Sequence, residues 1–421
     1  MEHNGVIGKM RTIISHPLAL GSAFVFAGSM ISNVAAYVYH LAVGRTLGPI
    51  GYGELSSLIS LLYLFGVPVN VLQTVLVKFF STYKANGSVS NARFLFSKAF
   101  HAILIAVGIF AAVTVLASPM VGNFLHLTNN RYIIWIALTF VFSTLVVVNT
   151  GVTQGFQLFY WVGSFTAVTA LLRLGFGVYF ARWGVEMTIA SGAITTMIMY
   201  ALYYLPIRFI FKEKPKAITL TKKDIIKFSI PTFLTMLGIT SLFSTDIILV
   251  RHFFDANSSG VYSAVAVLGK VIYFASSAVT LVVFPMISEK VAKREDSNRL
   301  ITLSMLAVSG ISVLITTMYF LIPDTITHLL FGTSFLSASA YLGIFGIFIS
   351  LFSVAQLFLM SCLAIGNTKV WILSLGAAVL QILGIIIFHS SLTDIITVNI
   401  GVSLVLTVSV LVFHFFNTRH E

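Results

Sequence analysis

Two positively charged side chains lie deep inside long apolar segments of this chain. Arg173 stands within the segment Leu171–Phe180, and Lys270 stands within Tyr262–Pro285. A fixed cation near the middle of a membrane costs roughly 2.5–3.5 kcal/mol on insertion scales, so such groups usually face a bundle interior or a watery cavity. Arginine offers a planar fork to phosphate oxygens, and lysine offers a point charge. The two residues predict that the protein handles an anion, such as a phosphate or pyrophosphate, inside the bilayer.

Three more charged residues are expected in the same half of the membrane. Arg45 and Arg251 end the first and seventh predicted spans, and Asp246 lies a turn or two inside the seventh. If these spans line one cavity, it is cationic with one carboxylate, and we predict that Arg45, Arg173, Arg251 and Lys270 bind the substrate. Two other interpretations stay open. Both end arginines can snorkel to the interface, and Asp246 can form a structural pair with Lys270 or Arg251.

His40 and Asp246 occupy matching places in the two halves of the chain, each five residues before an arginine. Histidine titrates near neutral pH, and a carboxylate binds protons or Na⁺. Either residue is therefore a candidate for coupling transport to an ion. The alternative is a hydrogen-bonded contact between two helices.

The composition identifies the class of protein that positions these residues. Of 421 residues, 58% are hydrophobic and 9% are charged, whereas a soluble domain carries about 25% charged residues. The chain is therefore expected to be an all-α integral membrane protein. It contains no Walker loop, no HExxH and no GxSxG sequence, so we expect no cofactor, no metal and no enzymatic activity.

Apolar runs of about 20 residues span a bilayer. We expect about twelve, at approximately 17–43, 54–80, 94–118, 131–153, 158–181, 186–210, 226–253, 259–287, 301–323, 335–363, 368–389 and 394–416. With the N-terminus inside, 19 of the 25 Lys and Arg residues fall on the inner side and four on the outer side. This bias predicts that both termini are cytoplasmic. It also explains most of the +12 net charge without a nucleic-acid partner.

The longest polar connector divides the predicted spans into two sets of six. The expected organisation is an N-terminal lobe (1–211), a basic cytoplasmic linker (212–227) and a C-terminal lobe (228–421). His40–Arg45 and Asp246–Arg251 end the first span of each lobe, and Gly51–Tyr52 and Gly260–Tyr262 open the next. An even number of spans in each half predicts parallel repeats, an architecture found in transporters.

Several of these segments resemble polysaccharide-biosynthesis flippases of the Wzx type, in the multidrug/oligosaccharidyl-lipid/polysaccharide exporter superfamily. In the first half the similar segment is Ala42-Val-Gly-Arg-Thr-Leu-Gly-Pro-Ile-Gly-Tyr-Gly-Glu-Leu55. In the second half it is Ser244-Thr-Asp-Ile-Ile-Leu-Val-Arg251, followed by Ser259–Ser263, Leu268–Lys270 and Val283–Glu289. These motifs cover only about residues 40–80 and 228–290.

The resemblance implies a V-shaped transporter of two six-helix lobes in the cell membrane. It implies translocation of a polyprenyl-pyrophosphate-linked oligosaccharide from the inner to the outer leaflet by alternating access, driven by H⁺ or Na⁺ or by the membrane potential. Membrane lipids are the other expected partners, and a monomer can contain the whole path. Among the family's motif positions are Arg45 and Glu54 in the first half and Asp246, Arg251 and Lys270 in the second. Glu54 thereby joins the candidates for coupling or ion pairing.

Two alternative functions stay open. A multidrug antiporter of the same fold needs carboxylates for cationic drugs, and the predicted spans offer essentially Asp246 alone. A membrane polymerase for lipid-linked sugars needs a sizeable outer loop with catalytic residues, whereas the predicted outer loops are about 4–14 residues long.

Overall fold

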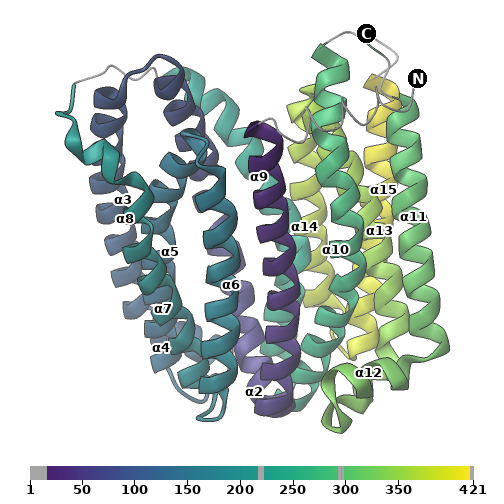
Figure 1. Ribbon diagram of the computed structural model, residues 1–421. Coiled ribbons are helices and arrows are strands. Elements are labelled where there is room, and N and C mark those ends of the chain that lie inside the picture. The colour runs from purple at the N-terminus through teal and green to yellow at the C-terminus, as the bar shows by residue number, and fades with distance from the viewer. Residues whose placement is uncertain (1–16, 217–221, 293–294, 296–297, 418–421) are drawn as a thin grey trace, which may run out of the picture. The chain divides into compact units, whose positions relative to one another are not determined.

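The computed structural model of this protein describes residues 17–216, 222–292, 295 and 298–417, which form helices without strands. Their bounds, labelled as in Figure 1, are α2 (Pro17–Ala85), α3 (Val89–Leu116), α4 (Ser118–Phe124), α5 (Arg131–Gly155), α6 (Phe159–Ala181), α7 (Val185–Leu202), α8 (Tyr204–Ile207), the 3₁₀ helix η1 (Arg208–Lys212), α9 (Lys222–Phe253), α10 (Ala256–Ala292), α11 (Asn298–Leu321), α12 (Pro323–Phe331), η2 (Thr333–Ala338), α13 (Ser339–Ile365), η3 (Thr368–Val370), α14 (Trp371–Ile387) and α15 (Leu392–Asn417).

Helix α2 is two membrane spans joined at Gly48. This residue has φ 66° and ψ 179°, a conformation that glycine adopts without steric cost. Pro49 follows at the first position of the next helix, where its missing N–H costs little. Eleven apolar stretches of the described chain are long enough to cross a membrane, and one of them, Ala23–Ala85, has 63 residues. At about 1.5 Å per residue it is far longer than one crossing needs. The kink at Gly48 divides it into two spans, so the described chain has twelve spans, as predicted.

The described helices form two compact units. The first unit comprises Met1–Val43, Pro68–Asn123 and Thr128–Lys222, and the second comprises Gly44–Val67, Phe124–Leu127 and Lys223–Glu421. Two short stretches of the N-terminal half therefore pack with the C-terminal helices. The predicted linker 212–227 contains residues 217–221, which lie outside the described residues, and the lobe boundaries stay a prediction.

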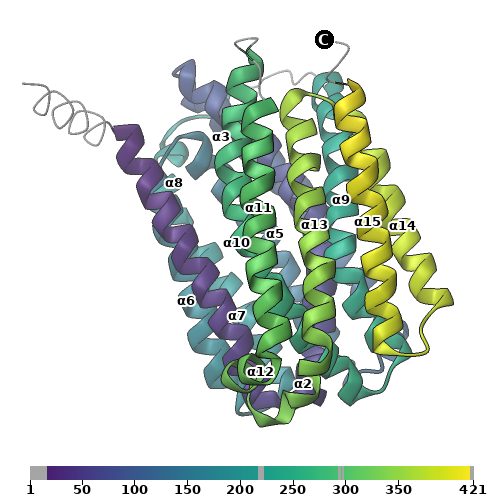
Figure 2. The same ribbon diagram turned by 90° about the vertical axis from the view of Figure 1, so that its right-hand side faces the viewer.

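Each unit repeats one packing pattern. In the first, α5 packs against α3 and α7, and α7 also packs against α6. In the second, α13 packs against α11 and α15, and α15 also packs against α14; Figure 2 shows α10, α11, α13 and α15 of this unit as neighbouring helices. The equivalent helices α5 and α13 are the most buried spans of their units. The shared order and pairing confirm the predicted parallel repeats.

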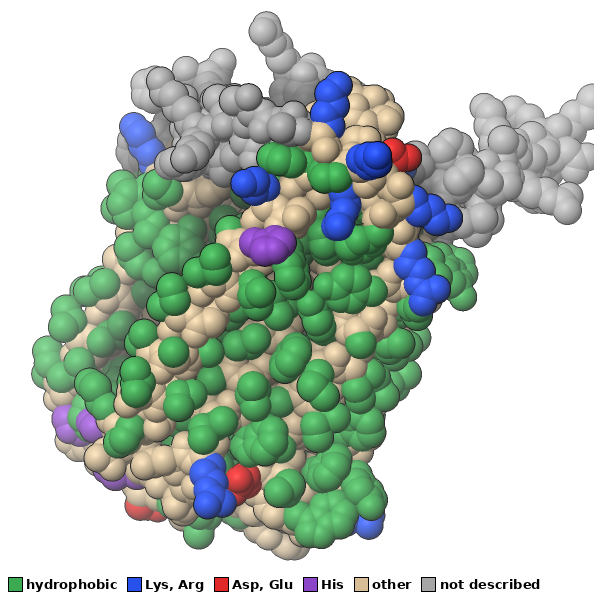
Figure 3. Space-filling view, turned by 90° about the vertical axis from the view of Figure 1, so that its left-hand side faces the viewer, with side chains coloured by type: hydrophobic (Ala, Val, Ile, Leu, Met, Phe, Trp, Pro, Cys, Tyr) green, Lys and Arg blue, Asp and Glu red, His purple; other side chains and the backbone are tan. Residues whose placement is uncertain are grey.

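The surface of the molecule is that of a membrane protein. Large hydrophobic side chains are exposed along the helices, for example Ile105, Ile109 and Leu116 of α3. Figure 3 shows hydrophobic side chains over most of one face, with most of its Lys and Arg side chains toward one end. Such a belt is what lipid tails solvate, and the chain is a multi-pass membrane protein.

Candidate functional site

Arg173 lies deep within helix α6 of the first unit and faces an aromatic ring. It stands eight residues before Ala181, the end of the helix, which corresponds to about 12 Å. Its guanidinium carbon lies 5.1 Å from the centre of the ring of Tyr39 on α2, within the range of a cation–π contact. Tyr39 itself is buried, so its ring provides a fixed wall behind the guanidinium.

Glycines hold α2 and α6 close enough for this contact. A Cβ atom added at Gly28 would lie 2.1 Å from the carbonyl oxygen of Gly163, and one added at Gly177 would lie 2.2 Å from the ring of Tyr39. Neither position has room for a larger residue. Small residues of this kind let membrane helices approach closely, and here they bring α2 and α6 into close contact beside Arg173.

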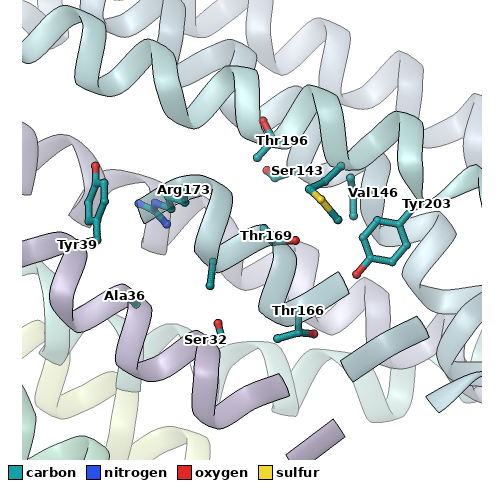
Figure 4. A pocket seen from close by; sticks show the side chains of 12 residues that line it. Ser32, Ala36, Tyr39, Ser143, Val146, Thr166, Thr169, Arg173, Thr196 and Tyr203 are labelled. Carbon is teal, nitrogen blue, oxygen red and sulfur yellow. The ribbon is translucent and has the colours of Figure 1, made fainter. Parts of the chain in front are cut away.

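Arg173 lines a partly open pocket of about 330 Å³, together with residues of α2, α5, α6 and α7 and with Tyr203, which directly follows α7. Figure 4 shows Arg173 and Tyr39 toward one end of this pocket and Tyr203 toward the other. Most of the polar lining consists of small hydroxyl side chains, namely Ser32, Ser143, Thr166, Thr169 and Thr196. The pocket thus combines one cation with a hydroxyl-rich wall inside the apolar helix bundle of the first unit.

Lys270 of the second unit is buried on α10. Its side chain is 8% exposed, and its ammonium nitrogen lies 3.9 Å from the centre of the Phe243 ring on α9. The opposite charge of Asp246, also on α9, attracts it. Within the described chain, the ion pairs closer than 4.0 Å do not include Lys270. Lys270 is therefore stabilised by an aromatic ring and by a carboxylate at longer range.

Asp246 belongs to a buried polar network that joins four helices. The Tyr262 hydroxyl of α10 donates a hydrogen bond to Asp246 Oδ2 at 2.7 Å. The Asn399 amide of α15 donates to the Tyr262 oxygen at 3.1 Å and to Asp246 Oδ2 at 3.5 Å, and the Gln381 amide of α14 donates to Asn399 Oδ1 at 2.9 Å. The side-chain oxygen of Gln381, Oε1, is buried and accepts no hydrogen bond within the described chain. Carboxylate and amide oxygens are ligands suited to small hard cations, and a carboxylate also binds a proton.

Arg251 is bound to groups of the protein itself. It forms an ion pair with Glu54 at 3.2 Å, and both side chains are almost fully buried. It also donates hydrogen bonds to the carbonyl oxygens of Leu125 at 2.8 Å and His126 at 2.7 Å. Arg251 thereby connects α9, the second span of α2 and the segment between α4 and α5. The prediction that it contacts the substrate is untested, but this geometry is that of a structural clamp.

Arg45 likewise binds main-chain carbonyls. Its guanidinium donates to the oxygens of Leu329 and Leu330, which are in the last turn of α12. The final carbonyls of a helix lack partners inside the helix, and a nearby cation stabilises that end. His40 packs edge-on against Tyr39, with ring centres 5.4 Å apart. The roles predicted for Arg45 and His40 stay predictions.

The sequence interpretation missed the partners of Asp246 and the hydroxyl wall around Arg173. Asn399 and Gln381 are amides in otherwise apolar spans, and such groups need partners inside a membrane, so a signal for them was present. The pocket hydroxyls gave none, because serine and threonine are ordinary residues of membrane helices. Among the described residues, no group of three or more His, Cys, Asp or Glu side chains could hold a metal ion.

Comparison with known proteins places this geometry in context. The chain is 23% identical over 294 residues to an uncharacterized membrane protein, MJ1375, of Methanocaldococcus jannaschii, and the match covers 65% of this chain and 68% of that protein. Two solved structures are similar. An inward-facing multidrug resistance MATE-family transporter of the MOP superfamily has a TM-score of 0.71 and 13% identity, covering 91% of this chain and 94% of that one. The lipid II flippase MurJ, in an inward closed conformation, has a TM-score of 0.70 and 15% identity, covering 92% of this chain and 87% of that one.

These structural matches show the fold, which is that of MOP-superfamily transporters. The family is shown by the sequence itself. A family model described as polysaccharide biosynthesis protein matches residues 18–291, which is more than half of the chain. The match confirms the resemblance inferred from the motifs, and this membrane protein belongs to the polysaccharide biosynthesis protein family.

Proposed function

We propose that this protein moves a polyprenyl-pyrophosphate-linked oligosaccharide from the inner to the outer leaflet of the cell membrane by alternating access. The family assignment supports a role in making a polysaccharide. The fold is shared with a lipid II flippase and with multidrug transporters, so fold alone does not select the substrate.

The observation that carries the proposal is the Arg173 pocket. Hydroxyl groups and one guanidinium line a pocket of the first unit, where a charge is costly and usually marks a functional site. An organic cation would be repelled by this pocket, because Arg173 is its only charged lining residue. A negatively charged group of a lipid-linked glycan is attracted by the same charge.

The Asp246 network supports coupling of transport to an ion. Asp246 is the acidic residue of a buried chain of hydrogen bonds that spans four helices of the second unit. Binding of H⁺ or Na⁺ there would neutralise the carboxylate, which changes its attraction to Lys270 and the hydrogen bonds it can accept. Such a change favours one arrangement of the four helices over another, which is the requirement for driving a transport cycle.

We propose that both termini face the cytoplasm. The support is the bias of Lys and Arg toward one side of the predicted spans; the terminal residues 1–16 and 418–421 lie outside the described residues. An Asn86→Cys variant reports the orientation, since position 86 follows α2 on the predicted inner side and the native Cys362 is buried. A membrane-impermeant maleimide should label intact cells only after permeabilisation, and labelling of intact cells would contradict the orientation.

The test of the function is translocation of a fluorescent polyprenyl-pyrophosphate oligosaccharide in proteoliposomes. We expect the wild type to move the lipid and Arg173→Gln to slow translocation by about 10- to 100-fold. This range corresponds to the loss of a hydrogen bond to a charged group, about 1.5–3 kcal/mol.

Arg182→Gln is the matched control. Arg182 directly follows the same helix, is exposed and does not line the pocket, so it should transport like the wild type. Absence of wild-type translocation across several glycans and under imposed H⁺ and Na⁺ gradients would contradict the proposal. Efflux of organic cations by the same preparation would then indicate a multidrug antiporter.

A further inference from the structure

Four of the hydroxyl groups that line the Arg173 pocket present hydrogen-bond acceptors. The hydroxyl of Thr169 donates its hydrogen to the carbonyl of Phe165 at 2.6 Å, and that of Thr166 donates to Val162 at 2.8 Å. Ser143 donates to a carbonyl one turn back on α5 at 3.0 Å, and Thr196 does the same on α7. Each of these hydroxyls has its single hydrogen committed to its own helix. Its lone pairs are the polar groups left for a ligand.

This arrangement selects against phosphate as the main occupant. A phosphate or pyrophosphate group offers essentially acceptor oxygens, and acceptors facing acceptors gain no hydrogen bond. Among the described residues of the lining Arg173 is the one cation, and a single cation does not balance the charge of a pyrophosphate. A sugar ring, by contrast, carries several hydroxyl hydrogens that match the acceptor wall.

The charge and size of the pocket narrow the choice further. Its lining contains one arginine and no aspartate, glutamate or lysine, which fits a ligand with one negative charge. Its volume of about 330 Å³ is at the lower end of small-molecule sites, which occupy roughly 300–1,000 Å³. There is room for one or two sugar rings. Neither a long oligosaccharide nor a polyprenyl chain fits.

The guanidinium of Arg173 suits a planar anion. Its carbon lies 5.1 Å from the centre of the Tyr39 ring, and a guanidinium presents its N–H groups as a planar fork. A carboxylate accepts two parallel hydrogen bonds from such a fork.

We propose that this pocket recognises a single sugar residue bearing one carboxylate, of the uronic acid type. Arg173 binds the carboxylate, and Ser143, Thr169 and Thr196 accept hydrogen bonds from the ring hydroxyls. The inference rests on the proposed function in taking this sugar to be part of the transported glycan. It assigns the pocket to the glycan and not to its pyrophosphate.

The first test is binding of soluble probes to the purified full-length protein in nanodiscs, measured by saturation-transfer NMR with competition. The probes are D-glucuronate, D-glucose and inorganic pyrophosphate. We expect D-glucuronate to bind at least about tenfold more tightly than either of the others, because it alone matches both the cation and the acceptor wall. Equal affinity for glucose, or tighter binding of pyrophosphate, would overturn the proposal.

Variants separate the two parts of the recognition. Arg173→Gln should reduce the preference for glucuronate over glucose to about twofold or less, and Arg173→Lys should retain part of it. Thr169→Val should weaken both sugars by a similar factor, because it removes an acceptor used by hydroxyls of either sugar. Arg182→Gln should bind as the wild type does. An unchanged glucuronate preference in folded Arg173→Gln would overturn the assignment.

Transport distinguishes this inference from the proposed function. Two fluorescent polyprenyl-pyrophosphate disaccharides are compared in proteoliposomes, one neutral and one containing a uronate residue. Faster movement of the uronate form, lost in Arg173→Gln, supports the inference. Equal movement of both forms overturns it and leaves the flippase proposal intact. If neither form moves but glucuronate still binds specifically, the flippase proposal is overturned. The binding experiment alone then supports the assignment of the pocket.

Discussion

Replacing Arg251 with methionine is expected to destabilise the protein by about 3–5 kcal/mol, the usual cost of breaking a buried charge pair from one side. The side chain of Glu54 would remain almost fully buried without its cation. The carbonyl oxygens of Leu125 and His126 would each lose a donor. The free energy of unfolding in mixed micelles measures the effect.

Two controls identify the cause of this loss. Arg182→Met removes an exposed arginine at the end of α6 and should change stability by less than about 0.5 kcal/mol. The double variant Glu54→Gln/Arg251→Met should be less destabilised than the sum of its single variants, because the second change removes the orphaned charge. An Arg251→Met protein within about 1 kcal/mol of the wild type, or strict additivity, would show that the clamp is not structural.

The segment Ala42–Leu55, which resembles the family, makes packing contacts within the protein. In the segment Ala42–Leu55, Gly44 leaves room for the Phe331 ring, which a Cβ atom would approach to 2.7 Å. Tyr52 packs edge-on against the rings of Phe331 and Phe335. These residues pack the middle part of α2, from Gly44 on, against the other helices of the second unit.

Two glycines, Gly53 and Gly260, allow the second span of α2 and the start of α10 to come into close contact. A Cβ atom added at Gly260 would lie 1.9 Å from the carbonyl oxygen of Pro49, and one added at Gly53 would lie 2.9 Å from the nitrogen of Gly260. The start of α10 and the second span of α2 therefore meet backbone to backbone. The matching Gly-Tyr and Gly-Val-Tyr sequences at the starts of these two spans lie in this contact.

The number of spans and their order could be predicted because apolar length is a direct consequence of bilayer thickness. The ends of the spans could not. Residues 44–53 were expected to form a loop, since they are rich in glycine and contain a charge and a proline. Within this segment only Gly48 leaves the helical conformation. The charged side chain of Arg45 binds carbonyl oxygens at the end of α12.

Arg173 and Lys270 could be predicted as special because charge is rare inside a membrane. Their surroundings could not, since the sequence does not say which ring or hydroxyl a helix rotation brings near. Tyr39 meets Arg173 through the close packing of α2 on α6, and Phe243 meets Lys270 across α9 and α10. The contrast with Arg45 is informative. Its charge was equally visible in the sequence, yet its guanidinium is bound to the end of α12.

Replacing Asp246 with asparagine is expected to abolish the response of translocation to an imposed ion gradient. Asparagine keeps the size of the side chain and an oxygen that can accept the 2.7 Å hydrogen bond from Tyr262, but it cannot bind a proton in the range that drives transport. In proteoliposomes, a gradient that stimulates the wild type tenfold or more should stimulate the variant by less than about twofold, a difference of about 1 kcal/mol or more.

Three further variants make this outcome interpretable. Asp394→Asn changes a half-exposed acid at the start of α15 and should keep the full gradient response. Asp246→Asn could fold poorly because Lys270 loses its opposite charge. The double variant Asp246→Asn/Lys270→Met removes both charges, so recovery of folded protein in it would identify that cause. His40→Gln tests the other candidate for coupling. Only a group that exchanges the ion during the cycle can make transport sensitive to that ion's gradient. A full gradient response in Asp246→Asn, with a flat response in His40→Gln, would therefore assign the coupling role to His40 in the first unit.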